Sequence, residues 1–80
     1  MELTEQFGAN VRQLREGLGI SQEELGFRTG LHRTYISLVE RGKRSVSLIN
    51  ICRLAFALKC EPAQLLEGIK MKRLPGKTPS

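Results

Sequence analysis

Hydrophobic residues recur at intervals of three and four along most of the chain, which is the period of an α-helix rather than of a β-strand. Phe7, Val11, Leu14 and Leu18 form the first such series and predict one buried stripe on a helix over Leu3–Leu18. No stretch alternates apolar and polar residues over several positions, as a half-buried strand would. The pattern therefore predicts an all-α fold.

Polar caps and glycines divide the next part of the chain into shorter helices. Ser21 is followed three residues later by a glutamate, which is the capping-box spacing, and predicts a helix that ends at Gly30. Another helix is expected over Arg33–Arg41, because Gly42 follows it and glycine tolerates the left-handed backbone that ends many helices.

A fourth helix is predicted between the cap residue Ser47 and Lys59, and it is unusually apolar. Its main apolar face comprises Leu48, Ile51, Leu54, Ala55 and Leu58. Ile49 and Phe56 widen this arc, and the remaining side comprises Asn50, Arg53 and Ala57. A helix apolar over so wide an arc should pack on its own core and on a second partner. We therefore predict a dimer interface at Ile49 and Phe56, the alternative being an unusually apolar exterior.

A short fifth helix is predicted over Pro62–Glu67, because proline is favoured in the first turn of a helix and Gly68 would end it. Together the five helices predict one compact domain over residues 1–68, the most that 80 residues allow. Residues 69–80 form a basic tail. Its last ten or so residues should be mobile, since they combine prolines and a glycine with little apolar content.

The net charge is +5 and the sequence pI about 9.8, which suits an acidic partner such as nucleic acid or an anionic membrane surface. Most of the excess lies in the tail, at Lys70, Lys72, Arg73 and Lys77. In the middle of the chain one acid, Glu40, faces a cluster of cations comprising Arg28, Arg33, Arg41, Lys43 and Arg44. Positive charge is therefore concentrated around the third predicted helix.

Several classes of protein are not supported by the sequence. No apolar run approaches the roughly 20 residues of a membrane span and no leader peptide is visible, so we expect a cytoplasmic protein without membrane contact. Cys52 and Cys60 are expected to be free, partly buried thiols. The chain has one histidine and no phosphate-cradling glycine loop, so no metal, cofactor or enzymatic activity is expected.

Residues 22–41 match a helix-turn-helix arrangement position by position. Its apolar contacts are expected from Leu25, Leu31, Ile36 and Val39. Gly26 is the small residue that lets the two helices approach, and Gly30 lies where the turn needs a left-handed backbone. The combination is far more specific than a single glycine motif.

If Ile36 and Val39 face the core, then Arg33, Thr34 and Ser37 lie on the outward side of the same helix. These side chains suit the major groove of DNA, because arginine pairs with guanine through two hydrogen bonds and the hydroxyls reach base edges or phosphates. A merely solvated helix face is the alternative.

The stretch from Phe7 to Leu66 resembles the helix-turn-helix domain of the lambda and 434 repressor and Cro superfamily, also called the XRE family. The resemblance rests on SQEELG, on GLHRTYIS and on the Glu-Arg-Gly sequence at positions 40–42. Within that family, LHRTYISLVERGKR is similar to the controller proteins of restriction-modification systems. The resemblance implies a five-helix domain that binds double-stranded DNA as a homodimer, with its third helix in the major groove of an inverted-repeat operator.

Carried over position by position, the resemblance implies roles for particular residues. The base-contacting positions are Arg33, Thr34 and Ser37. The positions that contact the DNA backbone are Gln22, Arg41, Lys43 and Arg44, although charged loops without such a role are common. Tyr35 either reaches a phosphate with its hydroxyl or covers the edge of the core. Arg15 and Glu40 match a structural ion pair.

Three positions depart from the family pattern. His32 stands where a better helix cap is usual, so the third helix is expected to fray at its start or to await a phosphate. Phe27 and Phe56 stand where relatives are commonly polar. Phe56 supports the predicted second surface of the fourth helix, and the sequence offers no explanation for Phe27.

Two functions are compatible with the sequence. The first is a dimeric, sequence-specific transcriptional regulator, with the tail as a solubilising or nonspecific DNA-attracting arm or, alternatively, a minor-groove contact. The second is an antitoxin-type module that binds a protein partner through the apolar face of the fourth helix, with DNA binding secondary.

Overall fold

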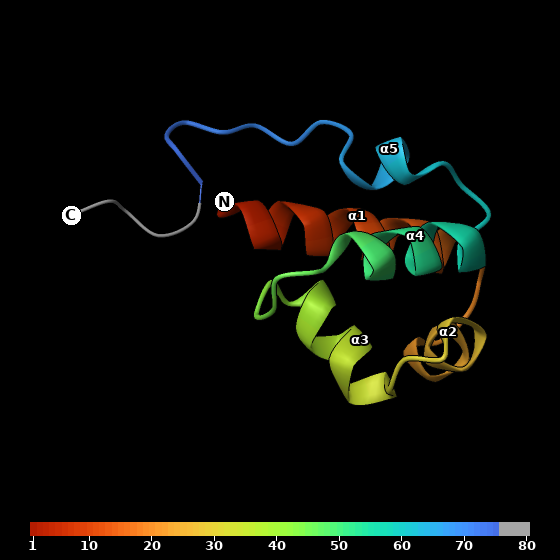
Figure 1. Ribbon diagram of the computed structural model, residues 1–80. Helices are drawn as coiled ribbons and strands as arrows, with labels where there is room; N and C mark the ends of the chain where they lie inside the picture. Colours follow the sequence, from red (N-terminus) through yellow and green to blue (C-terminus); the bar gives the residue numbers. More distant parts are fainter. Residues whose placement is uncertain (76–80) are drawn as a thin grey trace.

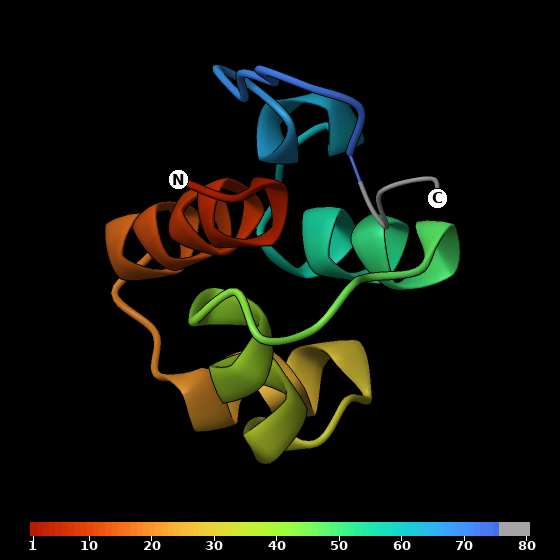
Figure 2. The same cartoon turned by 90° about the vertical axis from the view of Figure 1, so that its left-hand side faces the viewer.

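The computed structural model describes residues 1–75 and shows an all-helical domain in that range, as the hydrophobic pattern predicted (Figure 1). Its five helices are α1 (Leu3–Gly17), α2 (Gln22–Thr29), α3 (Arg33–Glu40), α4 (Leu48–Ala57) and α5 (Pro62–Leu65). Helices α1 and α4 form the middle of the domain, with α2 and α3 on one side and α5 on the other (Figures 1 and 2). None of the helices in residues 1–75 is long and apolar enough to cross a membrane.

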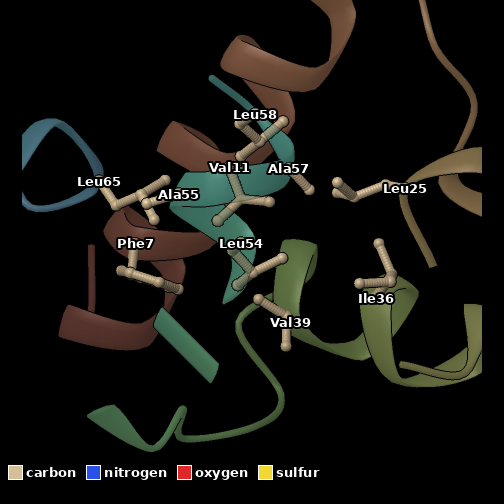
Figure 3. Packing of buried hydrophobic residues seen from close by; sticks show 10 residues of the cluster. All are labelled: Phe7, Val11, Leu25, Ile36, Val39, Leu54, Ala55, Ala57, Leu58 and Leu65. Atoms are coloured by element: carbon tan, nitrogen blue, oxygen red, sulfur yellow. The ribbon is translucent and has the colours of Figure 1, made fainter. Parts of the chain in front are cut away.

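A single hydrophobic core holds these helices together, and all five contribute to it (Figure 3). Its buried members are Phe7, Val11, Leu25, Ile36, Val39, Leu54, Ala55, Ala57, Leu58 and Leu65. Leu25, Ile36 and Leu54, from α2, α3 and α4, are fully buried. The orientation of α3 is therefore set by the packing of its inner face.

The turn between α2 and α3 depends on two glycines. Gly30 adopts a left-handed backbone with φ of 75°, as predicted, and this conformation redirects the chain after α2. A Cβ atom added at Gly26 would lie 2.7 Å from the carbonyl oxygen of Leu31, so a larger side chain there would push α2 away from the turn that leads into α3. The predicted close approach at Gly26 is confirmed.

Helix boundaries differ from the predicted ones by one or two residues at the C-terminal ends. Helix α1 ends at Gly17 instead of Leu18, α3 at Glu40 instead of Arg41, α4 at Ala57 instead of Lys59, and α5 at Leu65 instead of Glu67. In α4 the cause is local: Leu58 is the C-cap residue and Lys59 takes a left-handed backbone with φ of 59°. The capping bonds of the last turn decide these ends.

Four predicted burial states are wrong. Leu18 and Leu48 were expected in the core, but they are 40% and 75% exposed, because Leu18 follows the end of α1 and Leu48, the first residue of α4, borders an open groove beside α2. Ala57 was placed on the outer side of the fourth helix and is buried. Cys52 was expected to be partly buried and is exposed, whereas Cys60 is partly buried as predicted; both thiols are free.

The segment after α5 turns back along α1, where Lys70 is hydrogen-bonded through its backbone to the side chain of Gln6. The predicted basic tail over 69–80 therefore lies partly within the described residues, up to residue 75. Residues 76–80, which include Lys77 and half of the segment predicted to be mobile, lie outside them.

Candidate nucleic-acid interface

Helix α3 begins with a capped first turn that presents polar side chains to solvent. The Nδ1 atom of His32 accepts a hydrogen bond from the backbone N–H of Thr34 at 3.0 Å. Imidazole therefore caps this helix, contrary to the expectation that its start would fray. Because Nδ1 is the acceptor, the neutral ring carries its proton on Nε2, and the side chain is exposed.

The outward face of α3 contains the three residues predicted from the sequence to contact bases. Arg33 and Thr34 are exposed and Ser37 is half-buried. All three line an open hollow whose other wall is the start of α2, with Ser21, Gln22 and Glu23. The fold therefore brings the predicted base-contacting side chains and the N-terminal end of α2 onto one surface.

A buried ion pair fixes α3 against α1. Arg15 donates to Glu40 from Nε at 2.6 Å and from Nη2 at 3.1 Å, and the Glu40 side chain is only 2% exposed. Hydrogen bonding to Glu40 raises the pKa of Arg15 above its usual value. Arg15 also donates to the carbonyl oxygen of Ile20, so the same guanidinium holds the chain entering α2.

Gln22 belongs to this network. Its Nε2 atom donates to Oε1 of Glu40 at 3.1 Å, which leaves one amide hydrogen and the amide oxygen free. The N-terminal end of α2 also has backbone N–H groups without helical partners, which attract anions. Gln22, predicted to contact a phosphate, is thus held at the edge of the hollow, and its second amide hydrogen is available as a donor.

Tyr35 joins α3 to α4 and to the turn that follows α3. Its hydroxyl oxygen accepts a hydrogen bond from Nδ2 of Asn50 at 3.1 Å, and the guanidinium of Arg44 lies 5.2 Å from the centre of its ring. The ring packs against the core, so the core-edge role holds, while the hydroxyl proton remains available to an acceptor such as a phosphate.

The end of α3 and its following turn carry the remaining predicted backbone-contacting residues. Arg41, Lys43 and Arg44 are all exposed. The Arg41 side chain leans back over the helix end, where Nε donates to the carbonyl oxygen of Ser37 at 3.4 Å. Arg41 therefore borders the polar face of α3, and Lys43 and Arg44 follow in the turn that leaves it.

A second exposed face, on α4, is apolar. Leu48, Ile49 and Phe56 are 75%, 67% and 87% exposed, and they border a shallow groove together with Cys52 and two arginines, Arg28 and Arg53. Ile49 and Phe56, predicted to form a dimer interface, thus lie on one continuous surface. Phe27, on α2, is 84% exposed, and nothing in the structure explains it.

Some contacts at this interface were missed from the sequence. The capping role of His32 was not predicted, because Ser, Thr, Asp and Asn are the residues that usually cap the start of a helix. The bond between Asn50 and Tyr35 joins two helices, but one signal was available: Asn50 is a polar residue inside an apolar segment. Within residues 1–75, no group of three His, Cys, Asp or Glu side chains lies close enough to hold a metal ion.

Comparisons with known proteins agree with this geometry. The sequence pattern of the helix-turn-helix family matches residues 11–65. Control protein C.BamHI from Bacillus amyloliquefaciens is 52% identical over 62 residues, which cover 76% of this chain and 76% of the relative. Control protein C.SmaI from Serratia marcescens is 43% identical over 88% of this chain and 86% of its own length.

Solved structures give the same result. The restriction-modification controller protein C.AhdI from Aeromonas hydrophila superimposes with a TM-score of 0.76 at 52% identity, covering 78% of this chain and 94% of its own. The P22 c2 repressor, solved in complex with a synthetic operator, superimposes with a TM-score of 0.72 at 35% identity, covering 79% of this chain and 96% of its own. The chain therefore belongs to the XRE-type helix-turn-helix family of DNA-binding regulators.

Proposed function

We propose that this protein is a transcriptional regulator that binds an inverted-repeat operator as a homodimer. The observation that carries the proposal is the outward face of α3, where Arg33, Thr34 and Ser37 share one open hollow with the start of α2. In a helix-turn-helix domain the second helix enters the major groove, and this face is the one it would present to the bases.

Base selection is proposed to come from these three side chains. Arg33 would pair with a guanine through two hydrogen bonds, and the two hydroxyl residues would meet base edges or a thymine methyl group. Each good pair contributes about 1–3 kcal/mol of discrimination against the wrong base. Because the Arg15–Glu40 pair holds α3, little ordering free energy would be lost when DNA binds.

Affinity independent of sequence is proposed to come from groups around that face. Gln22, Arg41, Lys43 and Arg44 would bind phosphates on either side of the groove, and the hydroxyl of Tyr35 would donate to another. These contacts release counterions, so binding should weaken steeply as salt rises. Their geometric role is to fix the register of α3 on the duplex.

Dimerisation is proposed to use the apolar face of α4, at Ile49 and Phe56. A twofold dimer would place two α3 helices about 34 Å apart, one turn of the duplex. The relatives named as control proteins support a narrower assignment, in which the operator controls genes of a restriction-modification system. Such a regulator acts where the chromosome is, which in a prokaryotic cell is the cytoplasm.

Selection of bound sites from a library of random duplexes tests the proposal. The expected product is an inverted repeat whose half-site centres are about one helical turn apart. The triple variant Arg33→Ala, Thr34→Ala, Ser37→Ala is the control, and it should bind the pool without enriching any sequence. No enrichment by the unmodified protein, or enrichment of a single unrepeated site, would contradict the proposal.

The antitoxin-type alternative would use the same α4 face for a different protein partner. The relatives C.BamHI and C.SmaI are control proteins, which favours the DNA-binding function. A second small protein that co-purifies in equal amount, together with a monomeric state of this chain alone, would favour the antitoxin instead.

A further inference from the structure

The segment after α5 is fastened to α1 by two amide side chains, since Asn10 donates to the carbonyl oxygen of Glu67 and Gln6 bonds Lys70. Gln6 accepts a hydrogen bond from the Lys70 N–H at 2.8 Å and donates one to the Lys70 carbonyl oxygen at 2.9 Å. Antiparallel strands exchange the same two bonds between paired residues, so the backbone path at Lys70 is set in both position and direction. We refer to residues 69–75 as the C-terminal strap.

The strap runs toward the N-terminal end of α1. Its first residue, Ile69, packs against the core, and further along Nη2 of Arg73 lies 3.5 Å from Oε2 of Glu2, the N-cap residue of α1. Both partners are well exposed, so this pair adds little stability, but it marks where the strap goes. Figure 1 shows the segment passing over α1 and turning at that end.

The same end of α1 adjoins the turn between α3 and α4. The hydroxyl of Thr4 donates to the carbonyl oxygen of Gly42 at 2.9 Å. Leu66, which precedes the strap, and Arg44, in the turn, line one hollow together with Leu3. The strap and the Lys43–Arg44 turn therefore lie at the same end of the molecule, on opposite sides of the first turn of α1 (Figures 1 and 2).

Positive charge dominates at this end. Lys70, Lys72 and Arg73 are exposed on the strap, and Lys43 and Arg44 are exposed on the turn. The acids nearby are Glu2, which faces Arg73, and Glu5, whose carboxylate accepts the backbone N–H of Glu2. A tail that only improved solubility would need no fixed path, whereas cations on a fixed backbone lose less conformational entropy when they bind phosphates.

We propose that the C-terminal strap is a second phosphate-binding element, which adds contacts to the DNA backbone beyond those of the α3–α4 turn. The inference rests on the proposed function, since it requires that α3 and its turn face a duplex. The strap adds affinity for any sequence and leaves the choice of bases to Arg33, Thr34 and Ser37. Gln6 is a positioning residue for this element.

The salt dependence of binding to a random-sequence duplex tests the strap. In the triple variant Lys70→Gln, Lys72→Gln, Arg73→Gln, we expect the slope of log K against log salt to become shallower by about 2.7, because three lost phosphate contacts remove about 0.9 each. At about 0.1 M salt, relative to about 1 M, this corresponds to roughly 500-fold weaker binding. Gln6→Ala should lower the slope by about one, since the cations remain but their path is released.

Lys59→Gln serves as the matched control, because Lys59 is an exposed cation at the far end of α4. It should leave affinity and slope unchanged, and the thermal melts of Lys59→Gln and of the triple variant should overlay that of the unmodified protein. A neutralised strap that binds as tightly as the unmodified protein, or more tightly, overturns the proposal. Unchanged binding by Gln6→Ala overturns the positioning role of Gln6.

Failure of this inference is distinguishable from failure of the proposed function. If the strap variants match the unmodified protein while random-library selection still yields an inverted repeat, only the strap proposal is lost. If selection yields no preferred sequence but the strap variants still weaken binding to random duplex, the strap proposal stands and sequence-specific regulation fails.

Discussion

Helices α3 and α4 each pack one apolar face against the common core, but the exposed face of α3 is polar and that of α4 is apolar. Each is capped by a side chain, His32 in α3 and Ser47 in α4, and each buries an apolar stripe in the common core. The outer face of α3 is polar and bordered by cations, whereas the outer face of α4 exposes Ile49 and Phe56. Packing explains neither outer face, and the difference is what the two proposed partners, a nucleic acid and a second copy of the chain, would require.

The largest expected effect comes from a charge placed on the apolar face. Phe56→Glu should convert dimers to monomers, because two buried carboxylates would face each other across the twofold axis. At about 2 kcal/mol per hot-spot residue, the loss over both protomers is about 4 kcal/mol, or roughly a thousandfold in the dimer dissociation constant. Sedimentation equilibrium measures it.

Leu18→Glu is the control for that substitution. Leu18 is an exposed apolar residue at the end of α1, and it borders a different hollow from the α4 groove. The dimer should survive this change. A dimer that tolerates Phe56→Glu would remove Phe56 from the interface and leave the apolar face of α4 without a role in self-association.

A change beneath the polar face of α3 should destabilise the whole domain. Glu40→Ala removes one partner of a buried ion pair and leaves Arg15 and Gln22 short of an acceptor. The expected loss in unfolding free energy is about 3 kcal/mol, the lower end of the usual range because Arg15 keeps its bond to Ile20. For a domain of this size the melting temperature should fall by about 12 °C or more.

Arg12→Ala is the matched control for Glu40→Ala. Arg12 pairs with Glu16 on the exposed side of α1, and breaking such a pair costs at most about 0.5 kcal/mol. Equal melting temperatures for the two variants would show that the Arg15–Glu40 pair does not hold the polar face in place.

Within the polar face, base and phosphate contacts should separate. Arg33→Ala should cost about 1–3 kcal/mol on the preferred operator and relax selection at one base pair, whereas Lys43→Ala should weaken binding to all sequences and reduce the salt slope by about one. Competition binding with operator and random duplex measures both. A uniform loss for both variants would mean that Arg33 does not contact a base.

The smallest expected effect concerns the two thiols. Burial, with a smaller contribution from Glu61, raises the pKa of Cys60, so its thiolate fraction at about pH 8 is lower than that of an unfolded thiol, and its reaction with a disulfide reagent should be slower and rise at higher pH. Cys52, beside Phe56, should be protected only at concentrations that form dimers. Single Cys→Ser variants separate the two rates.

Protection of the Cys52 thiol also tests whether the apolar face of α4 is covered by a second copy of the chain. Phe56→Glu should leave Cys52 reactive at every protein concentration and should not alter Cys60. Protection of Cys52 that is independent of concentration would contradict coverage by a second copy of the chain.

Much of the fold could be predicted from local sequence. Phe7, Val11 and Leu14 indicated the stripe of α1, Ser21 the start of α2, and Gly30 the turn. These features act within a few residues, so their spacing carries the information. Burial at helix ends could not be obtained in this way, as Leu18 and Leu48 show, because it depends on which neighbouring helix covers the last turn.

In the candidate site, too, some features follow from local sequence and others depend on contacts between distant segments. The outward position of Arg33, Thr34 and Ser37 follows from helical periodicity once Ile36 and Val39 are taken as core. Their assignment to base contacts came from the family resemblance and from side-chain chemistry, and stays a prediction. The bond between Tyr35 and Asn50 required the folded chain, because these residues belong to different helices.

Residue spacing and local backbone chemistry are enough to establish the helical class of the chain, the turn between α2 and α3 and the polar character of the outer face of α3. The folded chain was needed to show that Gln22 shares Glu40 with Arg15 and that Lys70 is fastened to Gln6 across 64 positions of the chain. Such contacts depend on the packing of distant segments, which no local pattern encodes.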